Sequence, residues 1–429
     1  MMAQYFSVAR MLLDRRVTAV PRRVLGELGR QGRRQIPKDV QRSLDRWLPG
    51  WKGIRFVQHW LSGERITRHG GQWVINSFLP PFPGPAYDRM FENLLSGRRL
   101  SPVSAFLAIT AECPYRCWHC SYKNRQNGEL PTTEWKRVIG ELHSLGASII
   151  GFTGGEPCSR ADLPELVAAA AAGGAATIVF SSGACLTPTL LQELKAAGLW
   201  SICISLDHAE PARHDFLRGA VGCHARALQA LRTASRLGFY TMVGAVATRS
   251  LLQENQLPAL HRTARDCGAH ELRIVEPMPC GLLAKDSKDV LLSEAEVRSL
   301  REFHVQTNRA GGRPKVCAFN QIESPELFGC GAGTQHLFID ARGEVCPCDF
   351  TGMSFGNVTQ MPLARAWATM SEAMGSPRRH CFIRKNHALL LRHSDGKFPL
   401  PPEASLKVCA EAGKEEVPDY FQQMLGRKA

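Results

Sequence analysis

The sequence predicts an α/β protein built around a parallel sheet. From about residue 103 onward, short apolar runs typical of strands alternate with segments whose apolar residues recur at helical spacing. Six such strands follow one another, and repeated strand–helix units form a parallel sheet with right-handed crossovers, either open or curled into part of a barrel. We expect the strands at 103–110, 148–153, 177–181, 201–206, 240–247 and 271–275, and the helices at 133–145, 162–172, 188–197, 222–237, 255–267 and 293–309.

Different patterns flank this central region. Residues 1–70 are predicted to form Arg-rich helical segments, and their 15 Lys and Arg against 5 Asp and Glu account for +10 of the net charge of +14. Near the other end, strands at 334–340 and 344–346 are expected to form a hairpin, followed by a helix at 362–374. The predicted divisions are a basic helical appendage (1–102), a core (103–312), a small C-terminal domain (313–385) and a tail (386–429).

Composition limits the class of protein. The 429 residues are 44% hydrophobic and 21% charged, as in soluble globular proteins, and no apolar run is long enough to span a membrane. The N-terminus lacks the charged start and apolar core of a signal peptide. Fifteen cysteines without an export signal favour metal ligation in a reducing compartment over disulfides. The expected localisation is therefore cytoplasmic.

Three cysteines lie close together directly after the first predicted strand. Cys113, Cys117 and Cys120 have the spacing Cys-x3-Cys-x2-Cys, and no fourth cysteine lies nearby. Four-iron clusters normally take four thiolates, so three ligands leave one iron free to bind another group. A structural zinc site is the alternative, but such sites typically use two Cys-x2-Cys hooks. The triplet favours an enzyme over a non-enzymatic iron–sulfur electron carrier, whose cluster would have four protein ligands.

A glycine-rich turn follows the second predicted strand. Gly154 and Gly155 allow the backbone to approach a ligand closely, and Glu156 adds an anionic acceptor. In barrels of parallel strands, active sites collect at the C-terminal ends of the strands. We therefore expect this turn beside the triplet, where its carbonyls and carboxylate would suit a ligand that carries an ammonium group. A tight strand-to-helix turn is the simpler alternative for these glycines taken alone.

Together these motifs resemble the radical S-adenosylmethionine superfamily. The likeness covers roughly residues 103–310 and implies a partial (β/α)6 barrel. Its matching pieces are the cysteine triplet, Gly154-Gly155-Glu156-Pro157, Ser205-Leu206-Asp207 after the fourth strand, His214-Asp215-x2-Arg218-Gly219, and the segment from Glu276 to Gly281 after the sixth strand.

The resemblance also implies a mechanism. The triplet would hold three irons of a [4Fe–4S] cluster, and S-adenosyl-L-methionine would chelate the fourth. Residues 154–156 would receive the methionine amine, while Ser205 and Asp207 would lie near the ribose or the carboxylate, with helix capping as the alternative role for both. An external donor such as flavodoxin or ferredoxin would supply an electron, and the 5′-deoxyadenosyl radical would abstract a hydrogen atom from the substrate.

The C-terminal segment resembles the SPASM extension, or its shorter form, twitch, which binds auxiliary iron–sulfur clusters. Cys330 and Cys348 match the cysteines that open and close its hairpin. Cys317 and Cys381 are the expected further ligands by order only, and Cys346 is an alternative ligand. No dense run of four cysteines follows Cys348, so one auxiliary cluster is expected rather than two. Buried free thiols are the alternative interpretation.

The sequence leaves two classes of substrate as alternatives. By analogy with the SPASM branch it is a peptide or protein side chain. The basic N-terminal region, with Trp47, Trp51 and Trp60, instead favours contact of residues 1–70 with anionic lipid at the inner membrane surface, and hence a lipid substrate. A solvated helical face is the simpler interpretation of this charge. No recognised nucleic-acid module accompanies it, so nucleic acid is not an expected partner.

Overall fold

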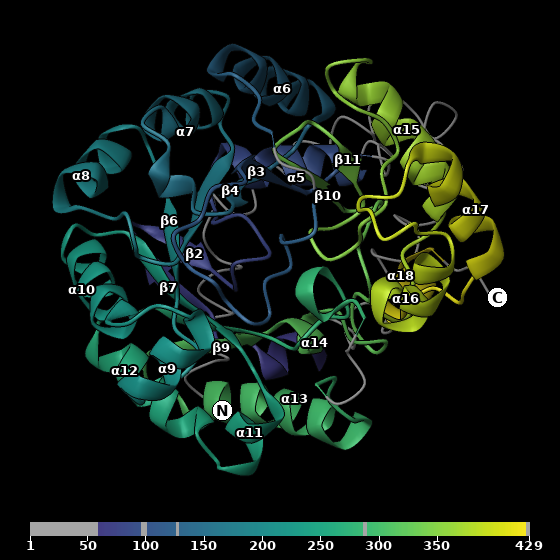
Figure 1. Ribbon diagram of the computed structural model, residues 1–429. Coiled ribbons are helices and arrows are strands. Elements are labelled where there is room, and N and C mark those ends of the chain that lie inside the picture. The colour runs from purple at the N-terminus through teal and green to yellow at the C-terminus, as the bar shows by residue number, and fades with distance from the viewer. Residues whose placement is uncertain (1–58, 96–100, 126–127, 286–289, 426–429) are drawn as a thin grey trace, which may run out of the picture.

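The computed structural model describes residues 59–95, 101–125, 128–285 and 290–425. Its central sheet has nine strands in the order β11-β10-β3-β4-β5-β6-β7-β8-β9, all parallel from β10 to β9. The strands curve around a central axis with helices outside them (Figure 1), so the predicted α/β partial barrel is confirmed. The six predicted strands are β3 (Ser104–Thr110), β4 (Ile149–Gly154), β5 (Ala176–Ser181), β6 (Ser201–Ser205), β7 (Tyr240–Val246) and β8 (Glu271–Val275).

Helices on the outside of the barrel bury one apolar face each. In α6 (Thr132–Leu145), the residues Trp135, Val138, Ile139 and Leu142 are buried and recur at helical spacing, and the helix ends at Gly146 in the left-handed conformation (φ 93°). Burying each such side chain contributes about 1.5–3 kcal/mol. The other outer helices are α7 (Leu163–Ala172), α8 (Pro188–Ala196), α9 (Pro211–Arg218), α10 (Cys223–Arg236), α11 (Arg249–Gln253), α12 (Leu257–Asp266) and α13 (Glu294–Ala310).

Two further strands extend the core sheet beyond the prediction. β9 (Lys315–Ala318) pairs in parallel with β8, and β10 (His336–Ile339) pairs in parallel with β3. The predicted C-terminal hairpin is present as β10 and β11 (Val345–Cys346), but its first strand belongs to the barrel sheet. The region after residue 313 is therefore continuous with the core.

The described part of the N-terminal appendage closes the floor of the barrel. The hairpin β1 (Thr67–His69) and β2 (Gln72–Val74) precedes α5 (Pro85–Leu95). At the start of β9, the Lys315 ammonium donates hydrogen bonds to the carbonyls of Val74 and Ile75, both at 2.8 Å. This segment is thus packed against the N-terminal ends of the strands, opposite the end where the sequence predicts the site. Residues 1–58, with most of the basic surplus, lie outside the described residues.

We expect this floor to make stability depend on pH through His270. Burial first, and then the neighbouring His69, Arg313 and Lys315, lower its pKa from 6.5 to about 3. Below pH 6.5 the unfolded chain therefore binds a proton that the folded chain does not, so stability present above pH 6.5 is lost as the pH falls towards 3. The loss is at most about 1.4 kcal/mol per pH unit.

Urea unfolding between about pH 7.5 and pH 5.5 checks this dependence. The free energy of unfolding should fall less steeply in His270→Gln than in the unchanged protein. An equal slope in the two proteins would show that His270 is not responsible.

The C-terminal helices gather on one side of the barrel (Figure 1). They are α15 (Leu363–Met374), α16 (Phe382–Arg392), α17 (Pro402–Ala412) and α18 (Asp419–Leu425), whereas the short helix α14 (Phe319–Ile322) packs against α13, β8 and β9. Within the described ranges, none of the helices is long and apolar enough to cross a bilayer.

Candidate active site

The loop that carries the cysteine triplet is held in place at both ends. It follows β3, and the backbone N–H groups of Arg116 and Trp118 donate to the carbonyls of Arg218 and Leu217 at the end of α9 (3.1 and 3.3 Å). On its other side, the N–H of Leu282 donates to the carbonyl of Cys120 (3.1 Å). The loop is therefore fixed by the exits of β6 and β8 as well as by its own strand.

The three thiols of this loop lie within electrostatic range of one another. Burial first, and then Glu156, Cys117 and Cys120, raise the pKa of Cys113 to about 11. All three cysteines are free and partly exposed. The arrangement offers three sulfur ligands from one short loop at the C-terminal end of the barrel.

The double glycine lies directly against the backbone that leads into the triplet. The N–H of Gly155 donates to the carbonyl of Thr110 (2.8 Å), and the N–H of Glu156 donates to that of Glu112 (2.7 Å). A Cβ atom at Gly155 would overlap the Glu112 carbonyl, and one at Gly154 (φ 125°) would overlap that of Thr110. Only glycine permits this approach. The structure therefore brings the two predicted motifs together.

The Glu156 carboxylate holds the turn in place. Its carboxylate is fully buried and accepts hydrogen bonds from the hydroxyl of Ser181 (2.7 Å) and from both the N–H and the hydroxyl of Ser182. It also accepts from the N–H of Cys158. These bonds tie the end of β4 to the end of β5, so the carboxylate positions the turn, and the carbonyls of the turn are left for an amine.

A buried ion pair links the predicted residue Asp207 to the triplet. The Arg218 guanidinium contacts the Asp207 carboxylate (Nε–Oδ2, 2.6 Å) and donates to the sulfur of Cys117 (3.7 Å). Burial alone would raise the pKa of Asp207, but Arg218, His119 and His214 together hold it below its ordinary value. Asp207 therefore positions Arg218, which puts a positive charge beside the Cys117 sulfur. The motif residue Arg218 had no role assigned from the sequence.

Ser205 and His119 complete this end of the barrel. Ser205 ends β6 and is partly exposed, as a contact residue would be, and Asp207 follows two residues later. Burial lowers the pKa of His119 to about 4, so its imidazole is neutral at pH 7, and its Nδ1 is buried without a hydrogen-bond partner.

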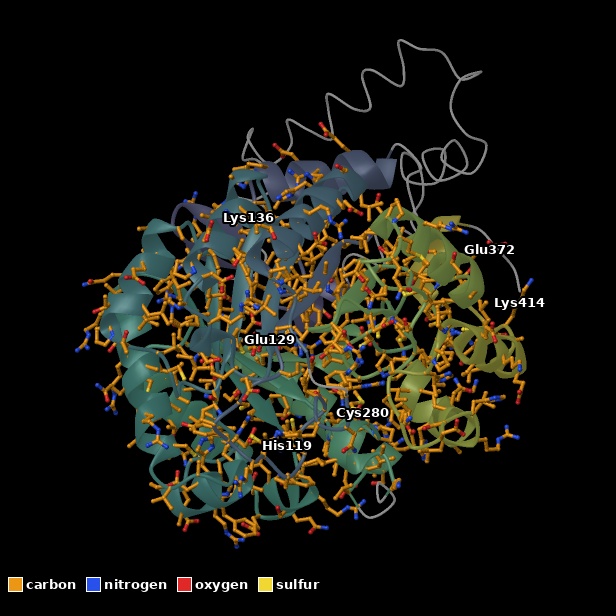
Figure 2. All side chains as sticks on the ribbon, turned by 45° about the horizontal axis from the view of Figure 1, so that its top comes forward. His119, Glu129, Lys136, Cys280, Glu372 and Lys414 are labelled. Carbon is orange, nitrogen blue, oxygen red and sulfur yellow. The ribbon has the colours of Figure 1, made fainter. Side chains whose placement is uncertain are left out.

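A pocket opens between the triplet loop and the C-terminal helices. Its lining includes Ser121 and Arg125 from the loop, Cys280 after β8, and Ile383 and Leu391 from α16. In Figure 2, Cys280 lies where the barrel meets these helices. Its side chain lines this pocket beside the triplet loop.

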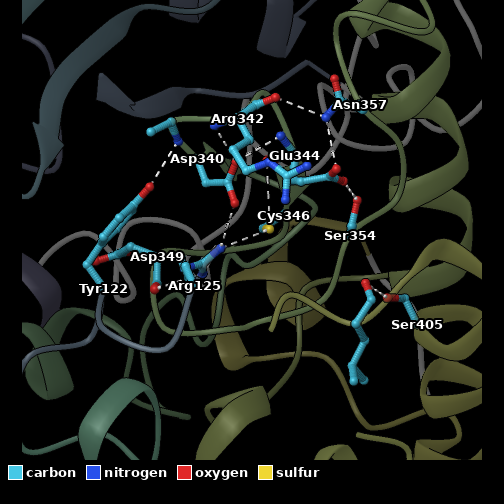
Figure 3. A network of polar contacts seen from close by, with 12 residues as sticks. Tyr122, Arg125, Asp340, Arg342, Glu344, Cys346, Asp349, Ser354, Asn357 and Ser405 are labelled. Carbon is cyan, nitrogen blue, oxygen red and sulfur yellow. Dashed lines mark hydrogen bonds and ion pairs between the residues drawn. The ribbon is translucent and has the colours of Figure 1, made fainter. Parts of the chain in front are cut away.

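The buried cation Arg125 joins the triplet loop to the C-terminal hairpin (Figure 3). Its guanidinium lies 3.6 Å from the Asp340 carboxylate and donates to the sulfur of Cys346 (3.5 Å). It also lies over the ring of Phe338, 4.8 Å from the centroid. Cys346, predicted as an alternative cluster ligand, therefore faces this network and not the other C-terminal cysteines.

A hydrogen bond of Tyr122 also joins the triplet loop to the C-terminal hairpin, and its contribution to stability can be tested. Its hydroxyl accepts a hydrogen bond from the backbone N–H of Ala341 (3.1 Å), and both groups are buried. In Tyr122→Phe that N–H is left unsatisfied, so we expect the free energy of unfolding to fall by about 1–3 kcal/mol. Denaturant unfolding checks this value. The conservative change Tyr87→Phe in the barrel floor is a comparison at a site remote from the hairpin.

Three of the predicted auxiliary ligands lie together. The side chains of Cys330 and Cys381 hydrogen-bond to each other, and Cys348 interacts electrostatically with Cys330. Each sulfur also accepts hydrogen bonds from backbone N–H groups. The donors are Ala332 and Phe382 for Cys330, Phe350 for Cys348, and Arg384 for Cys381. Such N–H···S bonds stabilise thiolates, as a metal site requires.

Cys317 is not brought to this set. It is fully buried on β9, where it pairs in register with Arg273. Its charged neighbours are Glu271 and Glu64 of the barrel floor. Order along the chain had suggested it as a ligand, but a strand in the core sheet directs it to the barrel floor.

The residues therefore fit a [4Fe–4S] cluster with S-adenosylmethionine. All 15 cysteines of the chain are free, and only the triplet presents three partly exposed thiols in one loop. The double glycine packs directly against the backbone that leads into that loop, an approach that any side chain would prevent. Arg218 supplies the positive charge that favours an anionic cluster.

Comparison with known proteins agrees with this geometry. Residues 107–251 match the model of the radical SAM superfamily, and residues 330–389 match SPASM, an iron–sulfur cluster-binding domain. A PqqA peptide cyclase of Bradyrhizobium diazoefficiens is 31% identical over 269 residues, which cover 60% of this chain and 70% of the relative. An AdoMet-dependent heme synthase of Methanosarcina barkeri is 26% identical over 283 residues, covering 60% and 80%.

Solved structures share the fold at lower identity. Streptococcus suis SuiB bound to S-adenosylmethionine aligns with a TM-score of 0.57 and 15% identity, covering 72% of this chain and 80% of that one. Native anSMEcpe with bound AdoMet gives a TM-score of 0.52 and 14% identity, covering 76% and 98%. Its C-terminal SPASM domain is a site for an auxiliary iron–sulfur cluster. The chain belongs to the radical SAM superfamily and is an enzyme whose cofactors are a [4Fe–4S] cluster and S-adenosylmethionine.

Proposed function

We propose that this enzyme reductively cleaves S-adenosylmethionine and abstracts a hydrogen atom from a peptide or protein side chain. The contact between the double-glycine turn and the triplet loop carries the proposal, because it puts a ligand-accepting backbone beside three free thiols. When bound, the cluster supplies the electron that splits the sulfonium and yields the 5′-deoxyadenosyl radical.

The protein's own residues position and shield this chemistry. Cys113, Cys117 and Cys120 would hold the cluster, and Arg218 would neutralise part of its charge from beside Cys117. The carbonyls of Gly154 and Gly155 would accept the methionine amine in a turn that Glu156 keeps rigid. Ser205, at the neighbouring strand end, would contact the ribose or the carboxylate.

A peptide substrate is supported by what similar proteins act on and by the position of Trp60. One relative is a PqqA peptide cyclase, and SuiB has been solved bound to the precursor peptide SuiA. The lipid alternative relied on aromatic residues of the basic region. Trp60, the described one of the three tryptophans, is partly buried and packs edge-on against Phe328 at 5.1 Å, so part of its ring is used in a contact within the protein. The support for membrane contact by residues 1–58 is their charge together with Trp47 and Trp51.

An external flavodoxin or ferredoxin is the proposed electron donor. The net charge of +14 favours association with an acidic carrier, because opposite charges accelerate encounter. Replacing dithionite with reduced flavodoxin should support turnover and should do so less well at high salt.

Isotope transfer tests both the reaction and the substrate class. The reconstituted enzyme is incubated anaerobically with dithionite, S-adenosylmethionine and either the peptide fraction or the lipid extract of host cells grown in deuterated medium. We expect deuterium in 5′-deoxyadenosine only with the peptide fraction. Deuterium only with the lipid extract would overturn the peptide assignment, and unlabelled 5′-deoxyadenosine with both would overturn hydrogen abstraction from either class.

A further inference from the structure

The auxiliary cluster site lacks a fourth cysteine. Cys330, Cys348 and Cys381 lie together, and no other cysteine is among the groups that most affect the pKa values of their thiols. In the same region, Cys346 bonds to Arg125, and the Cys409 thiol donates to the sulfur of Met374 (3.7 Å). Four-iron clusters normally have four protein ligands, so a residue of another type is available for the fourth iron.

His336 has the position and the free nitrogen that such a ligand needs. It is the first residue of β10, and its imidazole nitrogen, the Cys348 sulfur and an Asp349 oxygen lie within 4.8 Å of one another. Among the described residues this is the one group of three His, Cys, Asp or Glu side chains that is close enough to share a metal. Nε2 of His336 is buried and has no hydrogen-bond partner.

The other ring nitrogen is already fixed. Nδ1 of His336 hydrogen-bonds to the hydroxyl of Ser104 on β3 (2.8 Å), and the ring packs edge-on against Phe106 at 4.7 Å. Metal-binding histidines usually have their second nitrogen held in this way, which sets the orientation of the ring. Ser104 and Phe106 therefore orient Nε2 towards Cys348.

The neighbouring carboxylate is a poorer candidate. Asp349 accepts a hydrogen bond from the Cys348 thiol (3.2 Å) and lies 3.8 Å from Nε2 of His336. Imidazole suits iron, whereas carboxylates suit harder ions such as magnesium, calcium and manganese. Nitrogen is also an attested replacement for thiolate on iron–sulfur clusters, where it raises the reduction potential.

We propose that Nε2 of His336 is the fourth protein ligand of the auxiliary cluster, beside Cys330, Cys348 and Cys381. A neutral ligand in place of a thiolate leaves the cluster less negative and easier to reduce. The inference depends on the SPASM domain and not on the proposed hydrogen abstraction, so its test uses no catalytic readout.

Pulsed electron paramagnetic resonance tests the ligand directly. The variant Cys113→Ala/Cys117→Ala/Cys120→Ala keeps the full chain and leaves the auxiliary cluster as the only one. After reduction we expect nitrogen hyperfine coupling of a coordinated imidazole, and it should change when the protein carries 15N-labelled histidine. Couplings that do not respond to this label would overturn the proposal.

Two substitutions make the result specific to His336. In His336→Cys the cluster should assemble, lose the labelled coupling and have a lower reduction potential, because a thiolate adds negative charge. The new cysteine can itself bind iron, so a normal iron content in His336→Cys would show that the protein has folded and that only the histidine ligand is lost. A coupling that persists in His336→Cys would overturn the assignment. The buried Glu323 also lies near all three thiols and is the competing candidate. The proposal would be overturned if Glu323→Gln lost the cluster while the spectrum of His336→Cys stayed unchanged.

Discussion

Replacing Cys117 with alanine is expected to reduce the formation of 5′-deoxyadenosine to the level without enzyme. Cys117 is the central thiol of the triplet, and Arg218 donates to its sulfur, so its loss removes a proposed cluster ligand and one partner of a buried cation. Two remaining thiols from this loop cannot hold a four-iron cluster with one open iron. The measurement is 5′-deoxyadenosine per protein chain after anaerobic incubation with dithionite and S-adenosylmethionine.

A matched control separates this effect from the loss of any buried thiol. Cys267 is a buried thiol that follows α12 on the outside of the barrel, far along the chain from the triplet. Cys267→Ala should lose some stability and keep its 5′-deoxyadenosine and its iron. Product formation by Cys117→Ala, or its equal loss in Cys267→Ala, would contradict the ligand assignment.

Gly155→Ala is expected to have the second largest effect. Its new Cβ would overlap the carbonyl of Glu112, the residue before Cys113, so β4 or the triplet loop has to move. Overpacking of this kind costs about 1–3 kcal/mol of stability. A displacement near 1 Å in an active site costs on the order of 10²-fold in rate. We therefore expect weaker binding of S-adenosylmethionine and a fall in 5′-deoxyadenosine of about that size.

Gly140→Ala provides the comparison. Gly140 is exposed within α6, and an added Cβ there meets nothing within 4 Å. This change should raise the free energy of unfolding by about 0.5–1 kcal/mol, because alanine is favoured over glycine in a helix interior. Calorimetric titration with S-adenosylmethionine should show unchanged affinity in Gly140→Ala. Equal affinity in Gly155→Ala would contradict the role given to the turn.

Local patterns were sufficient to predict the barrel strands and the first two motifs. Alternating apolar runs gave six strands, and the triplet and the glycine turn each follow one of them. Because parallel strands end at the same edge, motifs far apart in sequence could be expected side by side. The hydrogen bond from the N–H of Gly155 to the carbonyl of Thr110 shows that the two motifs do lie side by side.

Other features depend on contacts that no local pattern reports. Glu156 was expected to receive a ligand amine, and no local pattern predicts the hydrogen bonds that its carboxylate accepts from Ser181 and Ser182 at the end of the next strand. Cys317 was assigned by order alone, and its strand joins β8 instead of the C-terminal set. Arg125 and His336 gain their roles from partners more than 200 residues away along the chain. Such pairings are set by tertiary packing, which spacing along the sequence does not encode.

The central claim is that three thiols of one loop leave an iron open to S-adenosylmethionine. Electron–nuclear double resonance on the reduced protein measures this most directly, using coenzyme labelled with 15N in the amine or 17O in the carboxylate. We predict hyperfine coupling from both labels, retained in His336→Cys and lost in Cys117→Ala. A fully reduced cluster that couples to neither label while the coenzyme is bound would contradict the account.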